Sequence, residues 1–274
     1  MDINKIYNED CFDTMRRMYE CEQKVDVILT SPPYCTPNDD ARKNTPEKFK
    51  NHVVFYDVFE GFESPEAYRV WTRKLFNAYD TILAENGVIL YNLSYSTEYP
   101  YLMWQCIADV INDTENDFVV ADCITWKKNS ALPQNRNSNR LTRVCELVFV
   151  IVRESELKTF KTTKEQYGRL QNNYTNLQSN YIEAPNNDIL DTEVNKLNNA
   201  TFSTLLVTEL LKRYAYPGFL VYDSFMGLGT TAVACKSYGC DYIGSELSEA
   251  QIEFANKRLN GLNTIKKSRV KTLF

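Results

Sequence analysis

Apolar segments that alternate with helical patterns constrain the fold of this chain more than any other feature. The segments 24–30, 88–92, 219–223 and 241–244 read as strands without a polar face, which is typical of parallel strands covered on both sides. Helical patterns separate them at 65–83, 203–213, 232–238 and 249–260. The segments 118–126 and 145–152 predict a late antiparallel hairpin. We therefore expect an α/β fold with a doubly wound, mostly parallel sheet.

A stiff peptide, Ser31-Pro32-Pro33-Tyr34, follows the first of these strands. Pro33 has no N–H, and Pro32 holds Ser31 in an extended conformation, so the Pro32 carbonyl is free to accept a hydrogen bond. With the Ser31 hydroxyl and the Tyr34 ring beside it, this strand end suits a planar base that carries an exocyclic amine. The alternative is a strand exit punctuated by prolines, and the motif alone does not separate the two.

A glycine-containing turn follows the strand 219–223. It reads Ser224-Phe225-Met226-Gly227-Leu228-Gly229-Thr230-Thr231 and opens the helix that Gly239 ends. Glycines let the backbone approach a ligand closely, and a helix start presents N–H groups. Glu246 follows the next strand, a little over 20 residues after Asp223, where nucleoside-binding α/β folds place an acid on the ribose.

The kind of cofactor follows from what this turn lacks. It has no third glycine in G-x-G-x-x-G spacing, and the chain has no G-x-x-x-x-G-K-[ST], which disfavours a pyrophosphate cofactor. A nucleoside with a small charged tail fits better, and S-adenosyl-L-methionine is such a ligand.

With both motifs in this order, the chain resembles the amino-group DNA methyltransferases of the beta arrangement. In that family the S/D/N-P-P-Y motif precedes the F-x-G-x-G motif, as here. Other segments resemble the family at 7–11, 83–90, 124–129, 145–150 and 243–246. The resemblance implies a Rossmann-like fold. A serine at position 31 is similar to the cytosine-N4 branch, which often acts in restriction-modification systems.

The resemblance also implies roles for individual residues. The catalytic set is Ser31, Pro32, Pro33 and Tyr34. The cofactor set is Asp10, Cys11, Asp223, Phe225, Gly227, Gly229, Thr230, Thr231, Glu246 and Leu247. Within it, the family places Asp10 at the adenine, Glu246 at the ribose and Asp223 near the amino group. The chain departs from the family at 198–203, where a His-x-Ala-x-Phe-Pro block is usual, and at Ser224 and Leu228.

The mechanism that the resemblance implies needs neither a metal nor a covalent enzyme intermediate. The target base leaves the duplex, Tyr34 stacks on it, and Ser31 with Pro32 holds the amine. Oriented oxygen dipoles stabilise the positive charge that grows on the amine nitrogen during methyl transfer.

Double-stranded DNA is the expected partner although the formal net charge is −5, because phosphate contact needs only a local basic stripe. The stretch 127–143 contains no acidic residue. Its basic residues, and a second cluster after the S-P-P-Y strand, form the predicted DNA-binding set: Lys127, Lys128, Arg136, Arg140, Arg143, Arg42 and Lys43. A solvated basic loop is the competing interpretation.

We expect one methyltransferase domain in three parts: a catalytic half at 1–152, a polar insertion at 153–197, and a cofactor-binding half at 198–274. The insertion is either a flexible segment or a target-recognition region. The helix at 65–83 carries aromatic residues at helical spacing, Tyr68, Trp71 and Tyr79 among them, which we assign to the core.

The setting of the protein is predicted from composition. No apolar stretch approaches a membrane span, no signal-peptide pattern opens the chain, and the eight cysteines contain no C-x-x-C. These features predict a cytoplasmic protein with reduced thiols, no membrane association and no metal site. A cognate restriction endonuclease is a possible partner, and monomer and homodimer both remain open.

Four other functions compete with this interpretation. An adenine-N6 methyltransferase would use the same machinery. A nicotinamide dehydrogenase is disfavoured by the missing third glycine. A DNA-binding module without activity would have no use for a cofactor loop. Cytosine ring-carbon methyltransferases use a cysteine directly after a proline, but Tyr34 separates Cys35 from Pro33.

Overall fold

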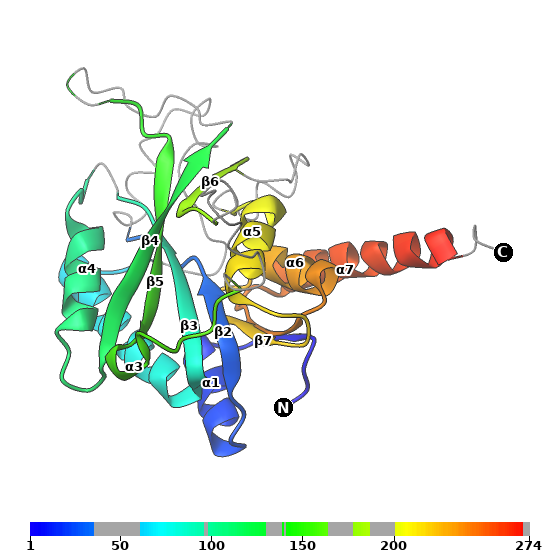
Figure 1. Cartoon of the computed structure of the whole chain (residues 1–274), viewed down its shortest axis with the longest axis horizontal. Coiled ribbons are helices and arrows are strands. Elements are labelled where there is room, and N and C mark those ends of the chain that lie inside the picture. The colour runs from blue at the N-terminus through cyan, green and yellow to red at the C-terminus, as the bar shows by residue number, and fades with distance from the viewer. Residues whose placement is uncertain are drawn as a thin grey trace, which may run out of the picture.

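The computed structural model describes residues 1–35, 61–95, 98–129, 139, 141–163, 178–186 and 201–270, with side chains up to 261 (Figure 1). The strands are β1 (Lys5–Tyr7), β2 (Val25–Thr30), β3 (Leu83–Leu93), β4 (Phe118–Lys128), β5 (Cys145–Arg153), β6 (Tyr181–Ala184), β7 (Leu220–Asp223) and β8 (Asp241–Ser245). The helices are α1 (Cys11–Glu20), α3 (Pro65–Ile82), α4 (Leu102–Ile111), α5 (Thr204–Tyr214), α6 (Thr230–Tyr238) and α7 (Glu249–Val270), with a 3₁₀ turn η2 (Glu154–Glu156).

These strands form one eight-stranded sheet in the order β1-β8-β7-β2-β3-β5-β4-β6. Every pair is parallel except the two that involve β5, which runs antiparallel to both β3 and β4. The mostly parallel sheet and the late hairpin are therefore confirmed. From β2 the chain continues to its neighbour β3 on one side, and from β7 it continues to its neighbour β8 on the other side. The direction in which strands are added therefore reverses between β2 and β7.

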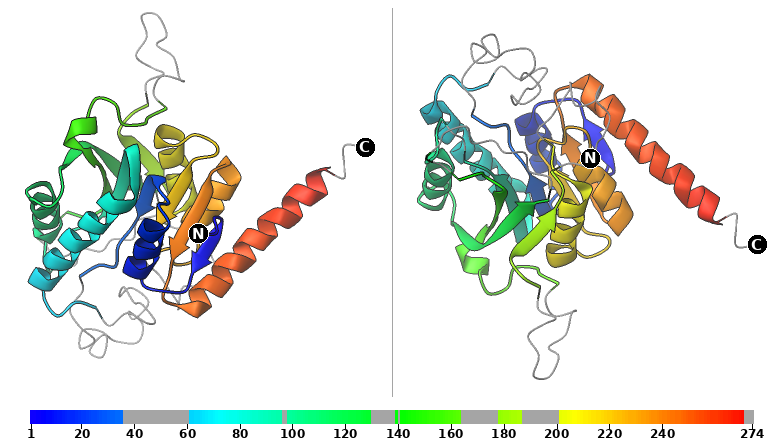
Figure 2. Two further views of the ribbon diagram at one scale, coloured as in Figure 1. Left: turned by 90° about the horizontal axis from the view of Figure 1, so that it is seen from below. Right: turned by 90° about the horizontal axis from the view of Figure 1, so that it is seen from above.

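Helices cover both faces of the sheet because the strands alternate between two apolar surfaces. Val27 and Leu29 face the cluster that α5, α6 and α7 complete. Ile28 faces the cluster that α1, α3 and α4 complete. Side chains in a strand point alternately to the two faces, and here both faces are apolar. Figures 1 and 2 show the two helical layers on either side of the sheet.

Helix boundaries follow local signals. Ser64 caps α3, with its side chain accepting a hydrogen bond from the Ala67 N–H at 3.0 Å and Pro65 as the first helical residue. Gly239 ends α6 with a φ of 98°, a left-handed conformation that glycine adopts without steric cost. Helix α7 extends to Val270, ten residues beyond the expected end at 260.

The structure corrects one expectation. Strand β3 begins at Leu83, directly after α3, and Gly87 lies inside it rather than before it. The register shifts there, since Val25 pairs with Leu83 but Val27 with Val88, and Asn86, among the extra residues, has a φ of 57°. Within the segment 153–197, expected as an insertion, β6 pairs with β4 as an edge strand of the same sheet.

Besides β6, the strand β1 and the helices α1 and α4 were not expected. Strand β1 is only three residues long, and α1 and α4 cover the sheet face that β2 and β3 present to α3. Among the described residues, the helices are too short or too polar to span a bilayer.

Candidate active site

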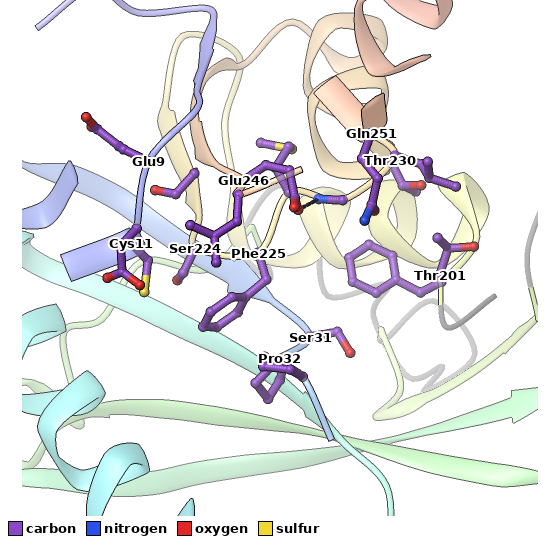
Figure 3. Close-up of a pocket in the computed structure, with 18 of the residues that line it drawn as sticks. Glu9, Cys11, Ser31, Pro32, Thr201, Ser224, Phe225, Thr230, Glu246 and Gln251 are labelled. Atoms are coloured by element: carbon purple, nitrogen blue, oxygen red, sulfur yellow. Dashed lines mark hydrogen bonds between the residues drawn. The ribbon is translucent and has the colours of Figure 1, made fainter. Parts of the chain in front are cut away.

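A cavity lies at the carboxyl ends of β2, β7 and β8. This is where the strand order reverses, the place at which open α/β sheets bind ligands. Figure 3 shows Ser31 and Pro32 on one side of the cavity, with Glu246, Gln251 and Thr230 on the other. The predicted residues that line it are Asp10, Cys11, Ser31, Pro32, Pro33, Phe225, Gly227, Thr230, Glu246 and Leu247.

Asp223, predicted to contact the cofactor, lies below the cavity and does not line it. Its carboxylate accepts hydrogen bonds from the Thr30 hydroxyl at 2.6 Å, the Thr231 hydroxyl at 2.5 Å and the Phe225 N–H at 3.0 Å. It therefore joins the end of β2 to the end of β7 and the start of α6. Burial raises the pKa of Asp223 to about 6, against the effect of the three donors.

Glu246 braces the turn after β7 from the opposite wall. One carboxylate oxygen accepts from the Gly227 N–H at 2.8 Å, and the other from the Ser248 N–H at 2.9 Å, at the start of α7. The Gly229 N–H is bound to the Met226 carbonyl at 2.9 Å. The N–H groups of Gly227 and Gly229 are thus used within the protein.

Gly229 has a structural task and does not line the cavity. Its φ is 78°, and a Cβ atom at this position would lie 2.5 Å from the Ala255 Cβ. A glycine therefore allows α7 to pack directly against the turn. Thr231 is also behind the wall, because its hydroxyl binds Asp223.

The start of α1 forms a third wall. Asp10 caps this helix by accepting from the Phe12 N–H at 2.8 Å, so one of its oxygens has a structural role. Cys11 is 5% exposed, and burial raises its pKa well above the usual range, so it contributes a neutral, weakly polar surface. Glu9 also lines the cavity and pairs with Arg17 at 2.6 Å.

Sequence reasoning missed part of the lining. Trp71, assigned to the core, lines the cavity, with its ring centroid 5.6 Å from that of Phe225. Its place on α3 facing the sheet end could have indicated this. The other residues not predicted are Glu9, Thr201, Phe202, Ser224, Met226, Leu228, Ser245 and Gln251. Three of these, Ser224, Met226 and Leu228, belong to the glycine turn itself.

The four residues predicted to be catalytic do not all line the cavity. Ser31, Pro32 and Pro33 line the cavity, whereas Tyr34 lies outside it, with its hydroxyl 3.5 Å from a Glu146 carboxylate oxygen. The Ser31 hydroxyl accepts a hydrogen bond from the Asn92 amide at 3.3 Å. Tyr34 and Ser31 therefore direct their polar atoms toward the ends of β3 and β5.

The predicted DNA-binding residues are only partly described. Arg42, Lys43, Arg136 and Arg140 lie outside the described residues. Lys127 pairs with Glu183 of β6 at 3.1 Å, and Lys128 pairs with Glu146 of β5, so acids from other strands neutralise both. The Arg143 guanidinium lies 5.0 Å from the centre of the Tyr95 ring. Phosphate binding by these residues remains a prediction.

Replacing Cys35 with alanine is expected to leave methyl transfer within about two-fold of the unaltered protein. Cys35 packs in a small cluster with Tyr68, Leu102 and Cys106, and burial raises its pKa, which disfavours the thiolate needed for attack on a base. Steady-state rates on mixed-sequence DNA would test this. A folded variant without turnover would instead point to a covalent mechanism.

The family of the chain follows from comparison with known proteins. Residues 25–257 match the family model described as DNA methylase. The chain belongs to the DNA methylase family. The match runs from the first residue of β2 into α7 and so includes the S-P-P-Y peptide and the glycine turn.

A curated relative of this DNA methylase is the type II methyltransferase M.HinfI of Haemophilus influenzae. It is 22% identical over 262 residues, which cover 94% of this chain and 68% of the relative.

Solved structures have the same fold. The M1.HpyAVI–SAM complex superposes with a TM-score of 0.60 at 24% identity, covering 93% of this chain and 98% of that one. The cytosine-N4-specific PvuII DNA methyltransferase superposes with a TM-score of 0.67 at 15% identity, covering 93% and 85%.

Proposed function

We propose that this DNA methylase transfers the methyl group of S-adenosyl-L-methionine to the exocyclic N4 amine of a cytosine in double-stranded DNA. The observation that carries the proposal is the meeting of the S-P-P-Y peptide and the glycine turn in one cavity at the switch between β2 and β7. M.HinfI is named a type II methyltransferase, which favours a protein that acts at a defined DNA site, with a restriction endonuclease as a possible partner.

The cavity suits this cofactor in three respects. It has aromatic and apolar walls from Trp71 and Phe225 for the flat adenine, and a carboxylate at Glu246 for hydroxyl groups. The Thr201 hydroxyl is buried, lines the cavity and has no hydrogen-bond partner among the described residues, so it suits a polar ligand group. When bound, the cofactor supplies an electrophilic methyl group.

The residues of the chain then have to hold and stabilise the amine. Ser31 and Pro32 line the cavity, where the Pro32 carbonyl would present an oxygen dipole to the nitrogen on which positive charge develops and the Ser31 hydroxyl would hold the base beside it. A base inside a duplex cannot reach this strand end, so the target nucleotide has to leave the stack, at a cost of a few kcal/mol. Tyr34, next in the chain to the lining residue Pro33, would stack on it, which contributes about 1–3 kcal/mol.

Nucleoside mass spectrometry on mixed-sequence DNA incubated with the protein and cofactor tests this proposal. We expect N4-methylcytosine, and a Ser31→Ala variant that loses roughly 10- to 100-fold in rate, because a hydrogen bond that holds the base is lost. N6-methyladenine would favour the second candidate, an adenine methyltransferase, since adenine also presents an amine beside a ring nitrogen. DNA without a methylated base would contradict both.

A further inference from the structure

Four polar side chains form a row across four adjacent strands, beginning at the catalytic serine. Each of these strands carries an apolar residue on the sheet face that α5 covers, namely Leu29, Leu90, Val148 and Trp126. Two residues along each strand, on the same face, stand Ser31, Asn92, Glu146 and Lys128. In the order β2-β3-β5-β4 they are diagonal neighbours, since Asn92 is opposite Val148 and Glu146 is opposite Trp126. We call these four residues the polar row.

Glu146 is the centre of the polar row. It is 9% exposed. Its carboxylate accepts hydrogen bonds from the Asn92 amide at 3.0 Å, from the Lys128 ammonium, and from the Tyr34 hydroxyl at 3.5 Å. A buried carboxylate is costly unless it is paired and hydrogen-bonded. Here the donors come from the ends of β3 and β4 and from the catalytic peptide, so one charge connects three segments.

This carboxylate fixes the orientation of the Asn92 amide. The amide nitrogen has two hydrogens, and it donates to Glu146 and to the Ser31 hydroxyl at 3.3 Å. The Asn92 Oδ1 atom is buried without a hydrogen-bond partner among the described residues, which costs free energy. Rotating the amide by 180° would point Oδ1 at the carboxylate, and the two oxygens would repel each other. The charge of Glu146 therefore keeps the amide in this orientation although Oδ1 has no partner among the described residues.

We propose that Glu146 is a positioning residue that sets the hydrogen-bond polarity of Ser31 through Asn92. Because the Ser31 oxygen accepts from Asn92, its own hydrogen is kept for an acceptor in the cavity. Cytosine and adenine both have an acceptor ring nitrogen next to the exocyclic amine, so Ser31 donates to the ring nitrogen while the Pro32 carbonyl accepts from the amine. Without the carboxylate, the amide turns and Ser31 donates to Asn92 instead. This inference rests on the proposed function.

The test compares Glu146→Gln with Glu183→Gln, which removes the other carboxylate paired with a lysine at this edge of the sheet. Transfer of tritiated methyl groups to mixed-sequence DNA counts methylation of any base. For Glu146→Gln we expect kcat to fall roughly 10- to 100-fold, with the cofactor Kd within about two-fold, because Glu146 does not line the cavity. Glu183→Gln should match the unaltered protein.

Two further variants separate positioning from a merely structural effect. In a Ser31→Ala background, Glu146→Gln should cost less than about three-fold, because both act through the same hydroxyl. The double variant Glu146→Gln/Lys128→Met removes both members of the ion pair, so neither charge is left buried without its partner. This variant should fold, but its kcat should stay low. Recovery of the full kcat in that double variant, or an undiminished loss in the Ser31→Ala background, would overturn the inference.

The unaltered protein provides the control on the proposed function. If it methylates DNA and Glu146→Gln does so equally fast, only the positioning role of Glu146 is wrong. If the unaltered protein binds the cofactor but places no methyl group on any base, the proposed function itself is contradicted.

Discussion

Replacing Asp223 with alanine is expected to destabilise the protein by about 3 to 5 kcal/mol. The change leaves the Thr30 hydroxyl, the Thr231 hydroxyl and the Phe225 N–H without their shared acceptor, and it opens a gap where β2 meets β7. Urea unfolding at pH 7 measures the loss. An alanine variant as stable as the unaltered protein would show that these donors find other partners.

The same carboxyl group predicts a dependence of stability on pH. Burial raises its pKa in the folded protein to about 6, above the ordinary value of 3.8, so the folded state binds the proton more tightly than the unfolded state. The resulting stabilisation is complete below pH 3.8 and is lost as the pH rises through about 6. A shift of about two units corresponds to about 3 kcal/mol. Asp223→Asn lacks this contribution.

Urea unfolding of both proteins at several pH values isolates this effect from other titrating groups. The free energy of unfolding of the unaltered protein, minus that of Asp223→Asn, should fall by about 3 kcal/mol between pH 4 and pH 7. A difference that stays constant over this range would contradict the raised pKa.

Replacing Glu246 with alanine is expected to weaken S-adenosyl-L-methionine binding on the order of 100-fold. The variant loses a carboxylate in the cavity wall, and it also releases the Gly227 N–H and the start of α7. Hydrogen bonds to a charged group contribute about 1.5–3 kcal/mol each. Isothermal titration calorimetry gives the dissociation constant.

Glu253→Ala is the matched control for this variant, because Glu253 lies on the exposed side of α7. Its cofactor affinity should equal that of the unaltered protein. If Glu246→Ala also binds with full affinity while remaining folded, the acid after β8 does not contact the ligand, and its role is confined to bracing the turn.

The fold could be predicted from the sequence where periodicity was strong. Strand β2 is a short apolar run, and helix α3 has apolar residues at helical spacing and a clear N-cap. The observed bounds of each differ from the expected bounds by one residue. Strand β6 could not be predicted, because it is four residues long, with two exposed side chains, and its place in the sheet depends on pairing with β4. Such tertiary pairing leaves little trace in local sequence.

The candidate site was predicted where one motif supplied both chemistry and position. The glycine turn and the S-P-P-Y peptide do line one cavity. The sequence could not show that Asp223 lies behind the cavity wall, because an acid at a strand end can point either to the ligand or into the protein. Glu146 and Asn92 carry no local signal. Their relation to Ser31 appears only when the register of four strands is known.

The register of the hairpin has a consequence for how this protein can vary. Deleting one residue within β5 would shift Glu146 to the opposite face, toward the apolar surface of Phe149 and Ile151. The connection between β4 and β5 is under no such constraint, because the ladder from Phe118–Arg153 to Lys127–Cys145 holds both strands in place. Insertions and deletions in that connection should therefore leave Glu146 on the same face of the sheet as Asn92.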